Sequence, residues 1–190
     1  LASARRIREV LTEQPDLANA ADPLETVPNG QIDFEGVSFK YNAAAQKSAL
    51  SDITLHIPAG ATVGIIGGTG SAKTTLVQLI PRLYDATEGT VKVGGHDVRD
   101  YDLTALRDAV GIVLQKNLLF SGTIRDNLKW GNPDAAEEQL WAACRAAHAD
   151  EFLDRMPDGL DTDLGQGGIN VSGGQKQRLC IARTLLKHPK

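Results

Sequence analysis

The 190-residue sequence predicts an α/β fold with a mostly parallel core, a small antiparallel β subdomain and an α-helical subdomain. Apolar runs of strand length and segments of helical periodicity follow one another through the middle of the chain. Before that region, alternating apolar residues between about 31 and 60 indicate two antiparallel strands. Between about 117 and 175 the pattern is mostly helical, which places the helical subdomain there.

Composition fits one domain with a subdomain and excludes several function classes. The net charge is −4 with both signs interspersed, so no basic face for nucleic acid is indicated. No apolar run reaches the roughly 18 residues of a membrane span. The start has neither Met nor an apolar signal region, so we expect a piece of a longer protein. Cys144 and Cys180 are expected to be buried free thiols in a reducing compartment.

The first 27 residues indicate a helix followed by a linker. Ile7, Val10 and Leu11 recur at helical spacing within residues 1–13, and Pro15 ends that helix. Prolines and a glycine up to residue 30 are typical of a linker. This helix is either a frayed surface helix or the tail of a helix from a preceding domain.

Two strands are expected between residues 31 and 57. The first alternates from Gln31 to Tyr41 with a bulge at Gly36, and the second runs from Leu50 to Ile57. Tyr41 ends the first strand just before a polar loop. It is either an ordinary sheet aromatic or a platform on which an adenine stacks.

A glycine-rich loop then separates an apolar run at 61–66 from a segment of helical periodicity. The loop residues are Gly67, Gly68, Thr69, Gly70, Ser71, Ala72, Lys73, Thr74 and Thr75. Strand, loop and helix in this order are typical of a phosphate-binding loop, whose backbone N–H groups turn inward toward an anion. Lys73 can reach the outer phosphates of a nucleotide, and the Thr74 hydroxyl can bind Mg²⁺.

Ala72 stands where the G-x-x-x-x-G-K-[ST] pattern has its second glycine. Glycine is required only where φ is positive or where a Cβ would collide with a ligand. Because alanine forms helices well and the following residues are helical, we expect Ala72 at negative φ in the first helical turn.

The remaining elements follow in order. We expect a strand at 90–93, a hairpin turn at 94–95, helices at 103–110, 123–128, 134–148 and 151–156, and a buried strand at 111–114. Gln115 comes directly after that last strand. The carboxyl ends of strands in an α/β sheet carry ligand contacts, although Gln115 could equally be a solvated residue that opens a loop.

The segment from Val171 to Arg178 resembles the signature motif of ATP-binding-cassette (ABC) ATPases. Its functional residues are Ser172, Gly173, Gly174 and Gln175, and the resemblance covers about residues 28–190. It implies a P-loop NTPase core that binds ATP and Mg²⁺. In the family, the signature contacts the γ-phosphate of ATP held by a second ABC domain. The same resemblance implies that Tyr41 stacks on adenine and that Gln115 contacts Mg²⁺ and senses the γ-phosphate.

Residues 82–90 and 162–168 further resemble exporters of this family. The second stretch is similar to a loop that touches the coupling helices of the transmembrane domains, with Gln166 where a Glu is usual. Residues 1–27 resemble the cytoplasmic end of the last membrane helix with its linker. The resemblance therefore implies an exporter-type half-transporter on the cytoplasmic face of the cell membrane, which couples ATP binding and hydrolysis to substrate translocation.

The resemblance also bears on hydrolysis by this chain. The family's Walker B strand, with its Mg²⁺-binding Asp and general-base Glu, should begin after Lys190, so we expect this chain alone not to hydrolyse ATP at a family-typical rate. Two alternative functions stay open. Ala72 and Gln166 leave open a non-hydrolysing regulatory subunit. The altered loop at Ala72 beside an intact signature favours a heterodimer slightly over a homodimer. A soluble ABC ATPase is the other alternative, without coiled-coil insertions or basic patches to support it.

Overall fold

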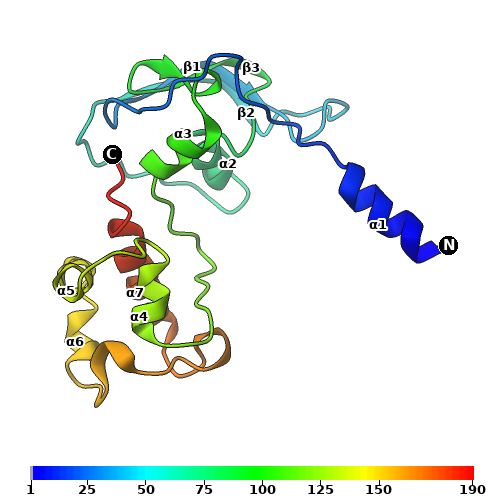
Figure 1. The fold of residues 1–190 in the computed structure, drawn as a ribbon. Helices are drawn as coiled ribbons and strands as arrows, with labels where there is room; N and C mark the ends of the chain where they lie inside the picture. Colours follow the sequence, from blue (N-terminus) through cyan, green and yellow to red (C-terminus); the bar gives the residue numbers. More distant parts are fainter. Residues whose placement is uncertain (1) are drawn as a thin grey trace. The chain divides into compact units, whose positions relative to one another are not determined.

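A computed structural model describes residues 2–190, which form two compact units (Figure 1). The first unit ends at Arg107 and contains a β-sheet and the glycine-rich loop. The second runs from Asp108 to Lys190 and is mostly helical. The expected α/β class, with an antiparallel β part and a helical part, is confirmed by this division of elements.

A four-stranded antiparallel sheet organises the first unit. Its strands are β1 (Ile32–Phe39), β2 (Leu50–Ile57), β3 (Glu88–Val93) and β4 (His96–Asp97), in the spatial order β2-β1-β3-β4. Phe34, Val37 and Phe39 of the central strand β1 are buried. The sheet is larger than expected, because β3 returns to pair with β1 and brings β4 with it.

The expected bulge at Gly36 is confirmed. Phe34 pairs with Leu55 and Val37 with Ile53, so three steps along β1 oppose two along β2. Gly36 takes a positive φ of 58°, which glycine adopts without a Cβ penalty. The extra residue keeps Phe34 and Val37 on the same buried face although they are three residues apart.

Short helices complete the elements of this unit. The loop helix α2 spans Lys73–Leu79, a 3₁₀ turn η1 spans Val98–Asp100, and α3 (Leu103–Ala109) crosses the division between the units. The Tyr101 side chain is fully buried, and its hydroxyl donates to the Val93 carbonyl at 2.8 Å. This bond fixes the segment after η1 to the end of β3.

The N-terminal helix α1 (Ala2–Thr12) is formed as expected. Its apolar side chains Ile7, Val10 and Leu11 are exposed. The linker behind it is attached to the sheet unit, because Leu24 exchanges backbone hydrogen bonds with Asp100 and Asp102. Across residues 2–190, none of the helices combines the length and apolar character that a membrane crossing requires.

The second unit is a helical cluster around a continuous core. Its helices are α4 (Ile124–Lys129), α5 (Glu137–Ala146), α6 (Asp150–Leu153) and α7 (Gly173–Leu185), with 3₁₀ turns η2 (Gly159–Asp161) and η3 (Gln166–Gly168). The largest fully buried side chains of this core are Ile124, Leu128, Leu140, Leu153, Leu164 and Leu179. This core holds α7, and with it residues 172–175, in place.

Two expected strands are not formed. Residues 61–66 and 111–114 belong to no sheet among the described residues. Parallel strands are stable when neighbours pair with them and other layers cover their faces, and the described part of the chain supplies no such neighbour. Val63, Ile65 and Leu114 are therefore exposed, and Ile66 is 99% exposed.

Capping residues set the helix starts in the second unit. The expected helix at 123–128 is confirmed by α4, and Thr123 and Asp126 form a reciprocal capping box at its start. The expected helix at 134–148 begins later, at Glu137, because the Gln139 side chain accepts from the Ala136 N–H and Asn132 caps a turn at Asp134 instead. The start of α5 is thus set by Gln139, which lies inside the helix, and not by Asp134, the first polar residue of the expected helix.

Asn127 is a buried polar side chain that holds the segment before α4. Its amide accepts from the Phe120 N–H at 2.7 Å and donates to the carbonyls of Phe120 and Thr123 at 2.9 and 3.0 Å. We expect Asn127→Ala to lower the free energy of unfolding by about 2 kcal/mol, because buried polar groups left without partners cost about 1–3 kcal/mol. Denaturant unfolding of the full chain measures this change.

Asn42→Ala is the matched control. Asn42 is exposed, and its side chain accepts a single bond from the Ala44 N–H at 2.9 Å. Its loss should change stability by less than about 0.5 kcal/mol. Equal effects of the two substitutions would contradict the role assigned to Asn127.

Candidate functional site

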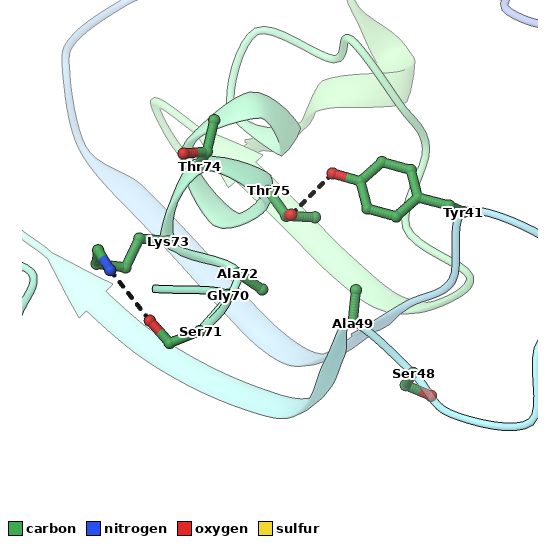
Figure 2. A pocket seen from close by; sticks show the side chains of 9 residues that line it. All are labelled: Tyr41, Ser48, Ala49, Gly70, Ser71, Ala72, Lys73, Thr74 and Thr75. Carbon is green, nitrogen blue, oxygen red and sulfur yellow. Dashed lines mark hydrogen bonds between the residues drawn. The ribbon is translucent and has the colours of Figure 1, made fainter. Parts of the chain in front are cut away.

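A cavity of about 410 Å³ lies beside the start of α2 (Figure 2). It is lined by Tyr41 after β1, by Ser48 and Ala49 before β2, and by the six residues from Gly70 to Thr75. The structure therefore brings Tyr41 and the second half of the glycine-rich loop together. Gly67, Gly68 and Thr69 are not part of the cavity lining.

The Lys73 ammonium group holds the glycine-rich loop in its shape. Its Nζ donates to the Gly67 and Gly68 carbonyls at 2.7 and 2.8 Å and to Ser71 Oγ at 3.1 Å. Ser71 Oγ in turn donates to the Gly68 carbonyl at 2.8 Å. All three ammonium donors are thus satisfied inside the loop, and Lys73 must exchange some of these bonds when an anion enters.

The expectation of a negative φ at Ala72 is wrong. Ala72 has φ 58° and ψ 21°, the left-handed conformation, and α2 begins only at Lys73. Because Ala72 lies one residue outside the helix, its helix propensity does not apply, and the turn that closes the loop sets its backbone. For a residue with a Cβ this conformation costs roughly 1–2 kcal/mol. The glycine of the usual pattern thus provides a conformation that Ala72 adopts under strain.

The space around the loop glycines distinguishes their roles. A Cβ on Gly67 would lie 2.6 Å from Ser71 Oγ, so a larger residue there would displace the Ser71 hydroxyl from its bonds to Lys73 and Gly68. A Cβ on Gly68 would meet nothing within 4 Å, and its φ is not positive. Nothing in the described residues therefore demands glycine at 68, which favours close approach by a bound molecule as the reason.

Tyr41 is fixed at the edge of the cavity by several contacts. Its hydroxyl and Thr75 Oγ1 are 2.8 Å apart, a hydrogen bond drawn in Figure 2. Its ring meets the Phe39 and Tyr84 rings edge-on, with centroid distances of 4.8 and 5.4 Å. Tyr41 nevertheless stays 59% exposed, so a substantial part of its ring is free to contact a ligand.

The two candidate Mg²⁺ ligands lie in different units. Thr74 is exposed and lines the cavity, so its hydroxyl oxygen suits a hard cation. Gln115 is exposed in the second unit, in the segment where no strand forms. The described residues hold no cluster of three or more His, Cys, Asp or Glu side chains that could bind a metal alone.

The signature residues form the start of α7. Ser172 Oγ accepts from the Gln175 N–H at 3.3 Å, and Gln175 Oε1 accepts from the Ser172 N–H at 2.8 Å. This capping box uses Ser172 Oγ as an acceptor and leaves its own hydrogen available to donate. Cβ atoms on Gly173 and Gly174 would meet nothing within 4 Å, so this helix end is open to an approaching group.

Lys176 links the signature helix to the preceding loop. Its Nζ donates to the Gly167 carbonyl at 3.0 Å, and the Asn170 side chain donates to the Asp163 carbonyl at 3.1 Å. The Gly165 N–H also donates to Asp163 Oδ1. Residues 163–170 are thereby fastened to α7, and a displacement of one would move the other.

Both cysteines are free and buried, as expected. Burial raises the pKa of the Cys144 thiol to about 12, and it also raises the pKa of the Cys180 thiol. The reactive thiolate is therefore scarce at neutral pH, and neither side chain suits nucleophilic chemistry.

Sequence reasoning missed three residues of this region. Ser48 and Ala49 line the cavity because the loop after Tyr41 folds back before β2. Tyr84 contacts the Tyr41 ring from a segment 43 positions further along the chain. In the sequence, Tyr84 shows only as an aromatic residue shortly after the loop helix. That position does not specify which residue it contacts.

A family model described as "ABC transporter" matches residues 50–190. The chain is 43% identical to a multidrug efflux ATP-binding/permease protein of Mycobacterium tuberculosis, over 189 residues that cover 100% of the chain. It is 42% identical over 190 residues to an uncharacterized ABC transporter ATP-binding protein of Bacillus subtilis.

A solved structure of a bacterial Atm1-family ABC exporter with ATP bound is also similar. It superimposes with a TM-score of 0.89 over 98% of this chain, at 35% sequence identity, and the chain covers 32% of it. The chain spans 16% of the mycobacterial protein and 33% of the Bacillus protein. The expected P-loop ABC ATPase fold is therefore confirmed.

The strain at Ala72 predicts the effect of restoring glycine. Ala72→Gly removes a left-handed penalty of roughly 1–2 kcal/mol but adds about 0.5–1 kcal/mol of unfolded-state entropy. We expect a net gain of about 0.5–1 kcal/mol in the free energy of unfolding, measured by denaturant titration of the full chain.

Gly70→Ala is the opposite control, because Gly70 has φ 82° and a Cβ there would be strained but not in collision. It should destabilise the chain by about 1–2 kcal/mol. A loss of stability in Ala72→Gly would show that the αL strain is not what distinguishes this loop.

Proposed function

Because the chain belongs to the ABC transporter family, we propose that it is the ATP-binding domain of an exporter, which couples ATP hydrolysis to substrate translocation. The observation that carries this proposal is that one cavity combines the Tyr41 ring with residues 70–75 of the phosphate loop. An aromatic face suits the base of a nucleoside triphosphate, and an anion-binding loop suits its phosphates. The relatives' names include a permease or an exporter, which favours this function over a soluble ATPase or a regulatory subunit.

In this proposal the residues act on different parts of the nucleotide. The Tyr41 ring stacks on adenine, and base stacking of this kind is worth about 1–3 kcal/mol. Residues Gly67 to Thr75 surround the phosphates. Lys73 exchanges its loop carbonyls for phosphate oxygens and stabilises their charge, which is the main way phosphoryl transfer is catalysed.

The Thr74 hydroxyl and the Gln115 side-chain oxygen are the groups that would hold Mg²⁺. When bound, Mg²⁺ neutralises charge on the phosphates. Both residues offer neutral oxygen atoms, and both side chains are exposed, so they fit a cation that keeps water and phosphate ligands as well.

The signature residues Ser172, Gly173, Gly174 and Gln175 serve ATP held by a second ABC domain. The free hydrogen of the Ser172 hydroxyl and the uncovered helix end are suited to donate to phosphate oxygens. Ala72 departs from the usual loop glycine, and this asymmetry between loop and signature favours a heterodimer slightly over a homodimer.

The remaining residues connect this domain to a membrane. We assign residues 1–27 to the end of a preceding membrane-domain helix with its linker, and residues 28–190 to the ATPase domain. The relatives are three to six times longer than the chain, which leaves room for membrane domains. The chain then works at the cytoplasmic face of the cell membrane.

A stacked aromatic pair supports a docking surface for the transmembrane domains. The Phe120 and Trp130 rings lie 4.5 Å apart at an interplanar angle of 16°, and both side chains are exposed. Exposed apolar patches of this kind are typical of protein interfaces. Trp130 is 66% exposed, so the helical core does not require it.

The nucleotide proposal is tested by ATP binding to the full chain. We expect Lys73→Ala to weaken binding about 10- to 100-fold, because a charge-assisted hydrogen bond contributes about 1.5–3 kcal/mol. Isothermal titration with ATP and Mg²⁺ measures it. Ser172→Ala should leave this binding unchanged, since Ser172 serves the other domain's nucleotide. Lys92→Ala, which removes a partly buried lysine paired with Glu35 on the sheet, is the control.

The heterodimer proposal predicts which of two substitutions lowers substrate transport more in the intact transporter. Ser172→Ala should lower transport more than Lys73→Ala, because Ser172 would contact the ATP that turns over. Equal losses would favour a homodimer. No loss of ATP binding in Lys73→Ala would contradict the nucleotide site itself.

The docking proposal predicts a separation of transport from ATP binding. Trp130→Ala should lower substrate transport at least fivefold in the intact transporter, because the partner loses an aromatic contact surface, while ATP affinity stays within twofold. Trp130→Phe keeps a ring to stack on Phe120 and should retain most transport. Parallel assays of transport in vesicles and of ATP binding separate the two effects, and wild-type transport in Trp130→Ala would refute the docking role.

A further inference from the structure

Three aromatic rings meet at the edge of the nucleotide cavity. The Tyr84 ring lies 5.4 Å from both the Phe39 and the Tyr41 centroids, and Phe39 and Tyr41 are 4.8 Å apart. Phe39 is buried at the end of β1, so it anchors the cluster to the sheet. Tyr84 does not line the cavity, although it contacts Tyr41, which does.

The segment that carries Tyr84 is fixed on both sides. The Thr87 N–H donates to the Ser38 carbonyl at 2.9 Å, and the Lys40 N–H donates to Thr87 Oγ1 at 3.0 Å. These bonds tie the segment to the residues on either side of Phe39. On the other side, the buried Arg82 guanidinium makes two bonds to the Asp85 carboxylate, at 2.7 and 3.1 Å. Tyr84 therefore stands on a rigid base.

Tyr41, in contrast, stands at the start of a loop. The strand β1 ends at Phe39, and residues 42–47 between Tyr41 and the cavity-lining Ser48 form turns and irregular backbone. Outside the ring cluster, the Tyr41 side chain has one described polar partner, the Thr75 hydroxyl at 2.8 Å. The ring cluster supplies the contacts that fix the tilt of the ring, which one hydroxyl contact at its tip does not determine.

From this arrangement we propose that Tyr84 is a positioning residue for nucleotide binding, which holds the Tyr41 ring in the orientation that receives the base. The inference rests on the proposed function, in which Tyr41 stacks on adenine. Thr75 belongs to the first turn of α2, so the Tyr41–Thr75 bond joins the base platform to the phosphate loop. Tyr84 thus keeps the two halves of the site at a fixed separation before the ligand arrives.

The test compares two ligands on the full chain, ATP and inorganic triphosphate. Both contact the phosphate loop, but only ATP uses the base platform. We expect Tyr84→Leu to weaken ATP binding about three- to tenfold, since an aromatic pair is worth about 0.5–1.5 kcal/mol, and to leave triphosphate binding within twofold. Tyr84→Phe keeps the ring and should restore ATP affinity. Calorimetric titrations of the wild type and each variant with both ligands give the affinities.

A second non-aromatic variant, Tyr84→Met, protects the test against a folding defect, and thermal unfolding of each variant identifies one. Equal weakening of ATP and triphosphate by both Tyr84→Leu and Tyr84→Met, or no weakening of either ligand, would overturn the positioning role. So would failure of Tyr84→Phe to restore ATP affinity.

Tyr41→Ala separates this inference from the proposed function. If Tyr41→Ala leaves ATP binding unchanged, the base platform itself fails. If Tyr41→Ala weakens ATP binding while both non-aromatic variants at Tyr84 do not, the proposed function stands and only the role of Tyr84 is wrong.

Discussion

The Lys73 ammonium group is the interaction on which the nucleotide site depends. It gathers the Gly67 and Gly68 carbonyls and the Ser71 hydroxyl around one positive charge, and so it holds an irregular backbone in a single shape. The loop in turn sets where α2 begins, and α2 places Thr75 against the Tyr41 hydroxyl. A chain of short-range contacts therefore runs from one ammonium group to the edge of the base platform.

Helix starts in this chain are determined by side chains that return to the backbone. Thr123 and Asp126 cap α4 in this way, and Ser172 and Gln175 cap α7. In the second case the capping residues are also the signature residues. The same geometry that stabilises the helix end thus presents a hydroxyl and open glycines to a phosphate, and no separate scaffold is needed to position them.

Local sequence patterns predicted most of the antiparallel sheet and the capped helices, because alternation, bulges and caps depend on neighbouring residues. The bulge at Gly36 and the helix expected at 123–128 are examples. Ala72 could not be predicted from propensity, since the closure of the loop sets its φ. The strands expected at 61–66 and 111–114 failed for a related reason, because a parallel strand depends on neighbours that the apolar pattern does not specify. The contact between Tyr84 and Tyr41 likewise depends on tertiary packing.

The uncovered segment 61–66 also affects how the chain behaves in solution. Its residues, Ala-Thr-Val-Gly-Ile-Ile, carry no charge and include no proline, and its end at Ile66 is almost fully exposed. Segments of this composition, with unpaired backbone groups, readily add to identical segments of other chains and build intermolecular sheets. Concentrated samples of the chain will therefore tend to aggregate through this segment. A strand that paired with it would satisfy these backbone groups and suppress the aggregation.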